Sequence, residues 1–298
     1  MENKYHASVV VPTYNRCRLL DHTLNSLVLQ TIPMTDFDVV VADDGSTDQT
    51  LEVVNKYRDK LNIKYVYQED KGYRPASARN AGILAAEGDV GIMIDSGVIL
   101  NVNCLEEHLN FYSSKGPNIA AIGYVFGFDL GDGLITLLKR LLVPENPQES
   151  IRLLSKEKLF YDVRDLHYRT YQDKIHELPA PWFYFWTCHV SARRKFLIEV
   201  GLFDEQYDGR WGCEDNDLGF RLCQHGEIHL LRTAESIHLP HPGDWQAKLE
   251  EGYHNCVYFN NKFPTPETKL FLDSYRSPLF PDINAQRMKM KLSESVSR

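Results

Sequence analysis

The chain has 298 residues, of which 43% are hydrophobic, and its formal net charge is −8. A chain of this length can bury the core of one large α/β domain with an extension. The negative charge, with a pI of about 5.8, excludes the basic surface that nucleic-acid-binding proteins need. No run of 18 apolar residues is present, so we expect no membrane-spanning helix.

Cysteine spacing and the first residues bear on the compartment. The six cysteines lack CxxC spacing, which indicates a reduced protein with free thiols. The N-terminus leads directly into an apolar strand, without the layout of a signal peptide. We therefore expect a cytoplasmic protein.

The first half of the chain alternates apolar runs with amphipathic segments. We expect strands over residues 8–11, 37–42, 63–67 and 90–94, with helices over 18–29, from about 46–48 through 57, and over 76–86. Near-continuous apolar strands separated by helices are typical of a parallel sheet that is covered on both faces. Ligands of such sheets bind at the carboxyl ends of the strands.

The second half is less regular. We expect strands over 119–126 and 227–231 and helices over 134–143, 191–200 and 247–260. A further helix is expected to follow the turn at 209–213 and to end at Gly226. Residues 144–181 are expected to form a charged and loop-rich insertion, and residues 238–243 a turn. The tail beyond 281 is expected to fray. This pattern predicts one domain over 1–260, with a nucleotide-binding half over about 1–126 and an acceptor half over about 127–260. Residues 261–298 then form a C-terminal extension.

A single carboxylate ends the fourth strand. The apolar run closes at Asp95, and Ser96 and Gly97 follow. A divalent cation that bridges phosphates usually needs a second acidic ligand nearby. Glycine occupies position 97, where that ligand could lie, so the partner of Asp95 must come from elsewhere if a cation binds.

Several segments carry a family resemblance. VVVPTYNR (9–16), VVVADDGSTD (39–48) and ARNAGILAAEGD (78–89) resemble the inverting glycosyltransferases of family 2, which have the GT-A fold. GLFDEQYDGRWGCEDNDLGFRLCQHG (201–226) resembles the acceptor and catalytic segment shared by chondroitin polymerase, the β-1,4-galactosyltransferases and the polypeptide N-acetylgalactosaminyltransferases. GYRPASARN (72–80) is most similar to the chondroitin polymerase form. The motifs occur in the expected order and cover residues 7 to about 245.

The resemblance implies both a fold and a reaction. The fold is α/β, a Rossmann-like GT-A domain with a mixed, mostly parallel sheet flanked by helices and a C-terminal helical extension. The reaction is transfer of a hexosyl or N-acetylhexosaminyl group from a nucleotide diphospho-sugar, most often a UDP-sugar, to a hydroxyl group with formation of a β-glycoside.

The resemblance also implies a nucleotide site. Carboxylates accept hydrogen bonds from ring N–H groups and hydroxyls, which suits Asp43 and Asp44 for uracil and ribose. Arg79, with Asn80, is expected to open a helix beside the diphosphate. The remaining expected nucleotide contacts are Pro12, Thr13, Tyr14, Arg16, Asp95 and Ser96. Taken alone, the Asp43–Asp44 segment could equally be an ordinary acidic turn with a helix cap.

For the metal site, the family pattern at strand four is Asp-x-Asp or Asp-x-His, from which Gly97 departs. The segment IHLPHPG (237–243) resembles the one where the family supplies a metal-binding histidine. We therefore expect Asp95 and His238 to hold a divalent cation, with His241 as the second candidate. Mn²⁺ is favoured over Mg²⁺ because it accepts imidazole more readily. The alternative is weak metal dependence, with the diphosphate neutralised by Arg79 and helix dipoles.

The catalytic base is expected just after Trp211. An inverting transfer needs one carboxylate to take the proton of the attacking hydroxyl. By resemblance, Asp215 is this base and Glu214 holds the acceptor sugar. Trp211 and Trp186 are candidates for stacking on the acceptor, although such aromatic residues often belong to the core. Cys213 stands where the family commonly has a second glycine.

Two other functions can be weighed against this one. A sugar nucleotidyltransferase would need a glycine-rich basic loop after the first strand, and PTYNRCR lacks the glycines. A binding protein that has lost catalysis would explain Gly97 but need not keep Glu214 and Asp215. The acceptor could be a polysaccharide, a lipid-linked sugar, a peptide or a small molecule. The helix over 134–143 could contact a membrane surface through Lys139 and Arg140, although packing in the core is more common.

Overall fold

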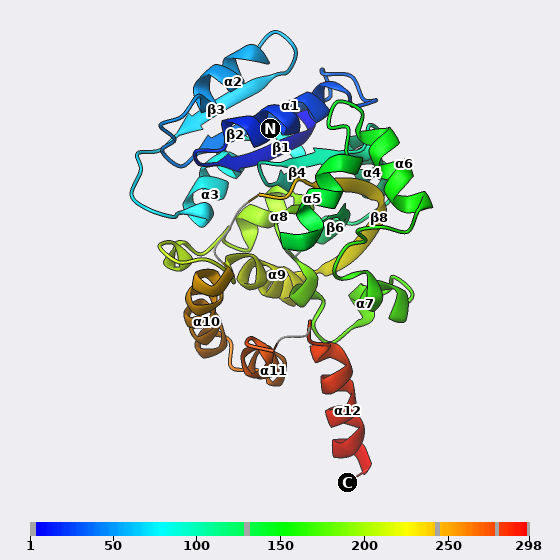
Figure 1. Cartoon of the computed structure of the whole chain (residues 1–298). Coiled ribbons are helices and arrows are strands. Elements are labelled where there is room, and N and C mark those ends of the chain that lie inside the picture. The colour runs from blue at the N-terminus through cyan, green and yellow to red at the C-terminus, as the bar shows by residue number, and fades with distance from the viewer. Residues whose placement is uncertain (1–3, 128–131, 242–244, 278–279, 297–298) are drawn as a thin grey trace.

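The computed structural model describes residues 4–127, 132–241, 245–277 and 280–296 (Figure 1). Within these residues the strands form one eight-stranded sheet in the order β3-β2-β1-β4-β7-β6-β8-β5. The strands are β1 (Tyr5–Thr13), β2 (Phe37–Asp43), β3 (Ile63–Tyr67), β4 (Gly88–Ile94), β5 (Val98–Leu100), β6 (Ile119–Phe126), β7 (His189–Arg193) and β8 (Glu227–His238).

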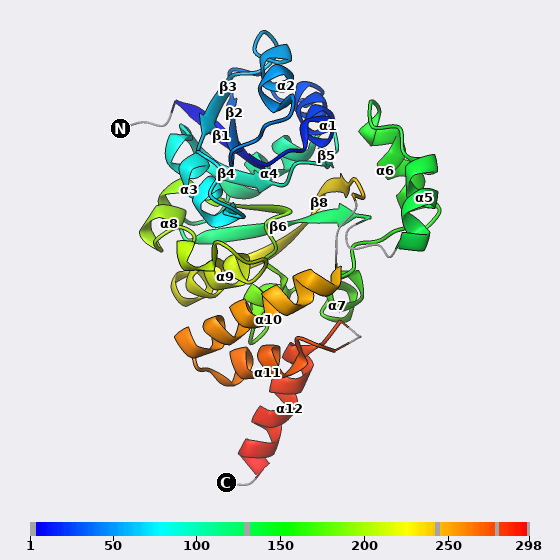
Figure 2. The ribbon, with the colours of Figure 1, turned by 60° about the vertical axis from the view of Figure 1, so that its left-hand side comes forward.

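Helices cover both faces of this sheet. The α-helices of the described residues are α1 (Cys17–Val28), α2 (Thr50–Lys56), α3 (Pro75–Ala85), α4 (Cys104–Ser113), α5 (Asp132–Leu141), α6 (Pro147–Lys156), α7 (Asp165–Thr170), α8 (Arg194–Glu199), α9 (Glu214–His225), α10 (Trp245–Lys262), α11 (Pro266–Ser274) and α12 (Ile283–Val296). Helices α10 to α12 lie at the end of the molecule opposite β2 and β3, in both views (Figures 1 and 2).

The sheet is mixed and mostly parallel, as predicted. Strands β3, β2, β1 and β4 run parallel to one another, and β6 is parallel to β8. Strand β7 is antiparallel to both β4 and β6, and β5 is antiparallel to β8. Strand β1 lies between β2 and β4, so the order in which strands are added to the sheet reverses at β1. Parallel sheets bind ligands at the carboxyl ends of the strands at such a point.

Two hydrophobic cores explain why the strands are apolar on both faces. Along β1, Val9 and Val11 pack into one core, and Val10 packs into the other. Successive strand side chains point to opposite faces, so a strand covered on both sides is apolar throughout. This is the reason that simple apolar runs located β1, β2 and β4 correctly.

The structure corrects several expected elements of the second half. The helix expected over 191–200 begins only at Arg194, because 189–193 form β7 and pair with β4 on one side and β6 on the other. Strand β8 continues to His238, which is therefore not in a turn. The tail forms α12 rather than fraying, and its first residues, Ile283 and Asn284, are buried.

The segment over 144–181 is not a loop-rich cover. It contains α6 and α7, and the side chains of Arg164 and Tyr168 are fully buried. Asp162 pairs with Arg164 at 2.7 Å, which makes a charged residue tolerable in the interior. High charge suggested exposure here because the sequence does not show which charges are paired.

No helix among the described residues is long and apolar enough to cross a membrane. The division of the chain near residue 126 stays a prediction, and both proposed halves supply strands to the same sheet.

Candidate active site

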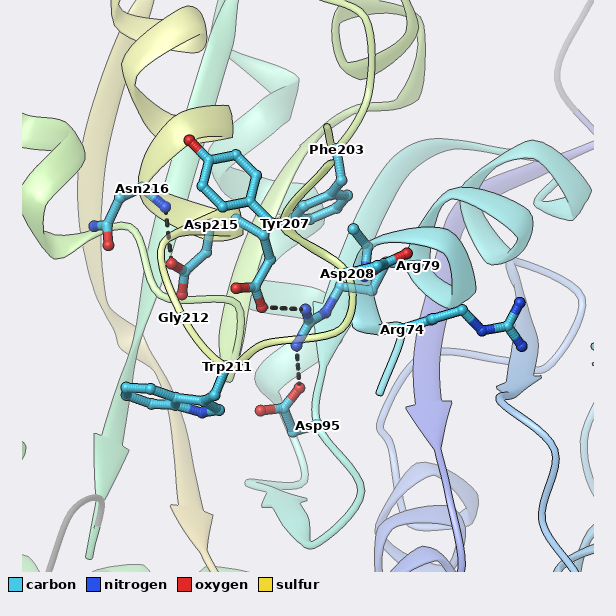
Figure 3. Close-up of polar contacts among 12 residues, drawn as sticks. Arg74, Arg79, Asp95, Phe203, Tyr207, Asp208, Trp211, Gly212, Asp215 and Asn216 are labelled. Carbon is cyan, nitrogen blue, oxygen red and sulfur yellow. Dashed lines mark hydrogen bonds and ion pairs between the residues drawn. The ribbon is translucent and has the colours of Figure 1, made fainter. Parts of the chain in front are cut away.

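The predicted polar residues gather where β1, β2 and β4 end and where α9 begins. Figure 3 shows the side chains of Arg79, Asp95, Asp215 and Trp211 around one region of the molecule. Arg79 comes from α3, Asp95 follows β4, and Asp215 lies in the first turn of α9. Residues far apart in the sequence therefore contribute to a common site.

Asp43, at the end of β2, is buried and holds its own turn. Its Oδ1 accepts hydrogen bonds from the amides of Gly45 (3.1 Å) and Ser46 (2.8 Å). Its Oδ2 accepts one from the hydroxyl of Tyr65 (2.6 Å). Gly45 has a φ of +97°, which a glycine adopts readily. These contacts give Asp43 a structural role, and its contact with a base stays a prediction.

Asp44 is also bound by the protein. Its Oδ1 accepts from Gln68 Nε2 at 2.6 Å and pairs with Arg74 at 2.9 Å, and its Oδ2 accepts from the Arg74 amide at 2.8 Å. Each carboxylate oxygen can accept more than one hydrogen bond, so these contacts leave capacity for a ligand.

The remaining nucleotide candidates lie along the end of β1. Thr13 is buried, and its hydroxyl oxygen has no hydrogen-bond partner within the described protein. Tyr14 is exposed and donates to Asp70 at 2.8 Å. Ser96 donates to the carbonyl of Pro12 at 2.8 Å, which ties the turn after β4 to β1. Arg16 is half-buried and immediately precedes α1.

The turn at 95–97 shows why glycine occupies position 97. Gly97 has a φ of +103°, a conformation that side chains rarely adopt. Its carbonyl accepts from the amide of Leu239 at 2.8 Å. Burial alone would raise the pKa of Asp95, but the Arg79 guanidinium, with smaller effects of His238 and Arg16, holds this pKa below its usual value.

His238 lies beside that turn because of the sheet pairing. It is the last residue of β8 and lies opposite Val98, the first residue of β5. Burial and the neighbouring His241 lower its pKa to about 4, so its imidazole is neutral at physiological pH. A neutral imidazole and a carboxylate that is 34% exposed are both groups that can bind a divalent cation. The rings of His238 and His241 are 5.4 Å apart.

Arg79 connects the two sides of the site. Its Nη2 contacts Asp95 Oδ1 at 3.0 Å, and its Nη1 contacts Glu214 Oε1 at 2.9 Å. The expectation that Arg79 and Asn80 open a helix was wrong, because α3 begins at Pro75 and both lie inside it. Asn80 instead bonds the main chain of Phe203 in both directions, at 2.9 Å each.

The N-terminus of α3 is already occupied by a carboxylate. Asp208 accepts hydrogen bonds from the amides of Ala76 (3.0 Å) and Ser77 (3.1 Å) and from the Ser77 hydroxyl. These amides are the groups that a phosphate would bind at a helix N-terminus. The expected role of this helix end in holding the diphosphate is therefore filled by the protein itself.

The two acidic residues predicted for catalysis begin α9. Glu214 is buried, and its Oε2 has no hydrogen-bond partner within the described protein. Asp215 accepts a hydrogen bond from the Asn216 amide at 2.8 Å. Cys213 precedes them with a φ of +71°, so a cysteine adopts the left-handed backbone that the family's usual glycine would provide more easily.

Asp215 has the pKa expected of a base. Burial and the Glu214 carboxylate raise its pKa to about 7, against the opposing effect of Arg79. A carboxyl group with this pKa can accept a proton near neutral pH better than an exposed aspartate can. This pKa shift depends on the burial of Asp215 and on its distance from Arg79, which the sequence does not show.

The aromatic candidates divide between site and core. Trp211 is half-buried, its amide donates to Glu251 at 3.0 Å, and Lys248 lies 5.9 Å from its ring. Trp186 is half-buried and packs 5.0 Å from the Arg164 guanidinium. Trp182 is 2% exposed and belongs to the core. Stacking of Trp211 and Trp186 on an acceptor stays a prediction.

Sequence reasoning missed two acidic residues that shape the site. They are Asp208, which caps α3, and Asp217, which lies two residues after Asp215 in α9. Asp217 is fully buried and binds Lys262 (2.6 Å), Arg221 (2.6 Å) and the Tyr207 hydroxyl (3.0 Å). The one available signal was the i, i+4 spacing of Asp217 and Arg221.

Among the described residues, one group of three side chains lies close enough to hold a metal ion, and it was not predicted. His189 Nε2 lies 3.0 Å from His108 Nε2 and 3.5 Å from Cys104 Sγ, and all three residues are buried. The other ring nitrogens contact Ser191 (3.0 Å) and Ser236 (2.9 Å). With His108 Nε2–H donating to His189 Nε2, the Ser191 hydroxyl donating to His108 Nδ1, and His189 Nδ1–H donating to Ser236, both imidazoles are fully paired. The cluster is therefore explained as a buried polar network.

Comparisons with known proteins agree with the geometry. Residues 8–195 match the family model described as glycosyl transferase family 2. Validoxylamine A glucosyltransferase of Streptomyces hygroscopicus subsp. jinggangensis is 36% identical over 293 residues, which are 98% of this chain and 69% of that protein. The enzyme of the same name from subsp. limoneus is 36% identical, and this chain spans 64% of it.

Two further matches support the predicted motifs and fold. Chondroitin synthase of Escherichia coli is 31% identical over 243 residues, which are 79% of this chain and 35% of that protein. The crystal structure of S. aureus TarS 1–349 in complex with UDP-GlcNAc has a TM-score of 0.63 at 22% identity, over 90% of this chain and 71% of that one. The second match shows the shared fold. The chain therefore belongs to glycosyl transferase family 2, as its motifs predicted, and is a glycosyltransferase.

Proposed function

We propose that this protein is an inverting glycosyltransferase that transfers a sugar from a UDP-sugar to an acceptor hydroxyl, with Asp215 as the general base. The observation that carries the proposal is the position and pKa of Asp215. It lies next to Glu214, which Arg79 connects to Asp95 at the end of β4, and its pKa is raised to about 7.

The chemistry follows from a single displacement. Asp215 accepts the proton of the acceptor hydroxyl while that oxygen attacks the anomeric carbon and the nucleoside diphosphate leaves from the opposite face. An α-linked donor then gives a β-glycoside. The free Oε2 of Glu214 is available to accept a second hydroxyl of the acceptor and orient it.

A divalent cation fits the donor side. Asp95 and His238 would hold it, and Mn²⁺ suits this carboxylate and imidazole better than Mg²⁺ does. Bound there, the cation would neutralise the charge that develops on the leaving diphosphate. Of the nucleotide contacts predicted from the sequence, we propose Pro12, Thr13, Tyr14, Arg16, Asp43, Asp44 and Ser96 for direct contact. The other two predicted contacts are Asp95, which is proposed to act through the cation, and Arg79, for which a different role is proposed below.

UDP is the proposed nucleotide because a structural neighbour of the same fold was solved with UDP-GlcNAc. An acceptor related to validoxylamine A is proposed, because the relative that matches 98% of this chain is named a validoxylamine A glucosyltransferase. Trp211 and Trp186 are proposed to stack on this acceptor. We propose that the protein acts in the cytoplasm and can make peripheral contact with a membrane surface.

The test compares Asp215→Asn with wild type. We expect the substitution to reduce transfer at least a thousandfold and to leave the dissociation constant of UDP, measured by calorimetry, within about threefold. Asp59→Asn, which changes an exposed carboxylate after α2, should alter neither.

Three results would contradict the proposal. If Asp215→Asn still transfers sugar at the wild-type rate, Asp215 is not the general base. UDP binding without transfer in the wild type would favour a binding protein that has lost catalysis. Release of pyrophosphate from UTP and a sugar phosphate would favour a nucleotidyltransferase.

A further inference from the structure

Arg79 forms a two-sided bridge that the sequence did not predict. It lies 16 residues before Asp95 and 135 residues before Glu214, and it binds both carboxylates at 3.0 and 2.9 Å. Its side chain is 7% exposed, and the guanidinium carbon lies 5.6 Å from the ring of Phe203. A guanidinium that is buried and paired twice is held in one orientation.

The bridge leaves part of each carboxylate available. Glu214 uses Oε1 for Arg79, while its buried Oε2 has no hydrogen-bond partner in the described protein. Asp95 uses Oδ1 for Arg79 and remains 34% exposed. A buried unpaired carboxylate oxygen is costly, so its presence at a site points to a ligand donor. An acceptor hydroxyl is such a donor.

The same bridge controls charge around Asp215. Glu214 and Arg79 are the charged groups that shift the pKa of Asp215. Asp215 in turn raises the pKa values of its other ionisable neighbours, which are Tyr73, Cys188, Cys213 and Tyr275. Arg79 is the cation in this set. It offsets part of the effect of the Glu214 charge on Asp215.

We propose that Arg79 is a positioning residue for the acceptor side of the site, rather than a ligand of the donor diphosphate. It fixes Glu214 so that one oxygen faces the acceptor, and it offsets the charge of Glu214 beside Asp215. Through Asp95 it ties this arrangement to the end of β4, where the donor binds. The inference rests on the proposed function, because it assigns Arg79 a part in the same reaction.

The experiment uses the full chain and three variants: Arg79→Met, Arg79→Lys and the double variant Arg79→Met/Glu214→Gln. UDP binding is measured by calorimetry with Mn²⁺. The carboxyl carbon of Asp215 is titrated by NMR in metal-free buffer. Transfer is measured as kcat and KM for the acceptor. Circular dichroism and thermal melting show which variants are folded.

For Arg79→Met we expect a UDP dissociation constant within about threefold of wild type, a KM for the acceptor raised at least tenfold, and a pKa of Asp215 raised by about one unit. Arg79→Lys keeps a positive charge, so the pKa of Asp215 in this variant should lie between those of the wild type and Arg79→Met. The double variant removes the uncompensated carboxylate and should return the Asp215 titration to the wild-type range or below.

Two outcomes would overturn the inference. A tenfold or greater loss of UDP affinity in Arg79→Met, with an unchanged acceptor KM, would make Arg79 a diphosphate ligand. If the pKa of Asp215 is the same in a folded Arg79→Met variant as in the wild type, Arg79 does not influence the charge of Asp215. If the wild type transfers no sugar, the proposed function fails and the inference fails with it, whereas the two outcomes above leave the proposed function intact.

Discussion

His238 at the end of β8 pairs with Val98 at the start of β5, and this pairing places His238 beside the turn that carries Asp95. The amide of Val98 donates to the carbonyl of Asp95 at 3.0 Å, which closes the turn. The amide after His238, that of Leu239, donates to the carbonyl of Gly97 at 2.8 Å. His238, a candidate partner for Asp95 in cation binding, therefore comes from β8, near the end of the sheet that β5 forms.

His238→Ala tests this partnership. We expect it to weaken UDP binding in Mn²⁺ at least tenfold, because removal of a metal ligand or its close support typically costs that much. Binding in EDTA should not change, and His254→Ala, an exposed histidine on α10, should bind UDP as the wild type does in both buffers. Calorimetry measures the UDP affinity of the wild type and of both variants, each in Mn²⁺ and in EDTA. Equal wild-type affinity in Mn²⁺ and EDTA would show that the donor binds without the cation.

Gly97→Asp tests whether the family's second acidic residue can be restored. Position 97 has a φ of +103°, so a side chain is strained there even though the nearest atom, Leu19 Cδ2, is 3.4 Å from the added Cβ. We expect a loss of about 1–2 kcal/mol of unfolding free energy in denaturant titrations and no gain in Mn²⁺ affinity. Gly116→Asp is the matched control, because its Cβ would meet no atom within 4 Å. Tighter Mn²⁺ binding by Gly97→Asp would contradict this account of the turn.

The first half of the fold could be predicted because its signals are local. Four apolar strands that alternate with helices give the parallel core without knowledge of any contact. Arg164, by contrast, is buried through its pairing with Asp162, which composition cannot show. Strand β7 was hidden for a similar reason, since 191–193 are extended only because β4 and β6 lie on either side.

The sequence grouped the candidate residues in one region of the fold but did not predict the contacts among them. Motif order placed Asp95, Glu214 and Asp215 in the same region, which the described structure brings together through Arg79. The bridge itself, and the capping of α3 by Asp208, depend on loops that fold back over long distances in the sequence. No periodicity or spacing carries that information.

The raised pKa of Asp215 predicts a pH-dependent stability. Its folded pKa is about 7, against a usual value of 3.8, so the folded state keeps the proton in this interval and the unfolded state releases it. Stability should therefore fall as pH rises from about 4 to 7. Asp215→Asn removes the ionisable group, and we expect it to raise the unfolding free energy on the order of 2 kcal/mol at pH 8 and to change it little at pH 4. Thermal melts at the two pH values measure this difference, and equal effects at both would contradict the assigned pKa.

The contact between Asp208 and α3 predicts a linked loss of stability and activity. Asp208→Ala leaves the amides of Ala76 and Ser77 without their carboxylate, and loss of such a cap costs about 1–2 kcal/mol. The loop that carries Trp211 would also lose an anchor, so we expect a higher acceptor KM, with UDP affinity unchanged. Asn146→Ala is the matched control, because Asn146 caps α6 by accepting from the Glu149 amide at 3.1 Å. It should lower stability by a similar amount and leave the acceptor KM as in the wild type. If both variants change the acceptor KM equally, the effect of Asp208 is one of general stability and not of loop placement.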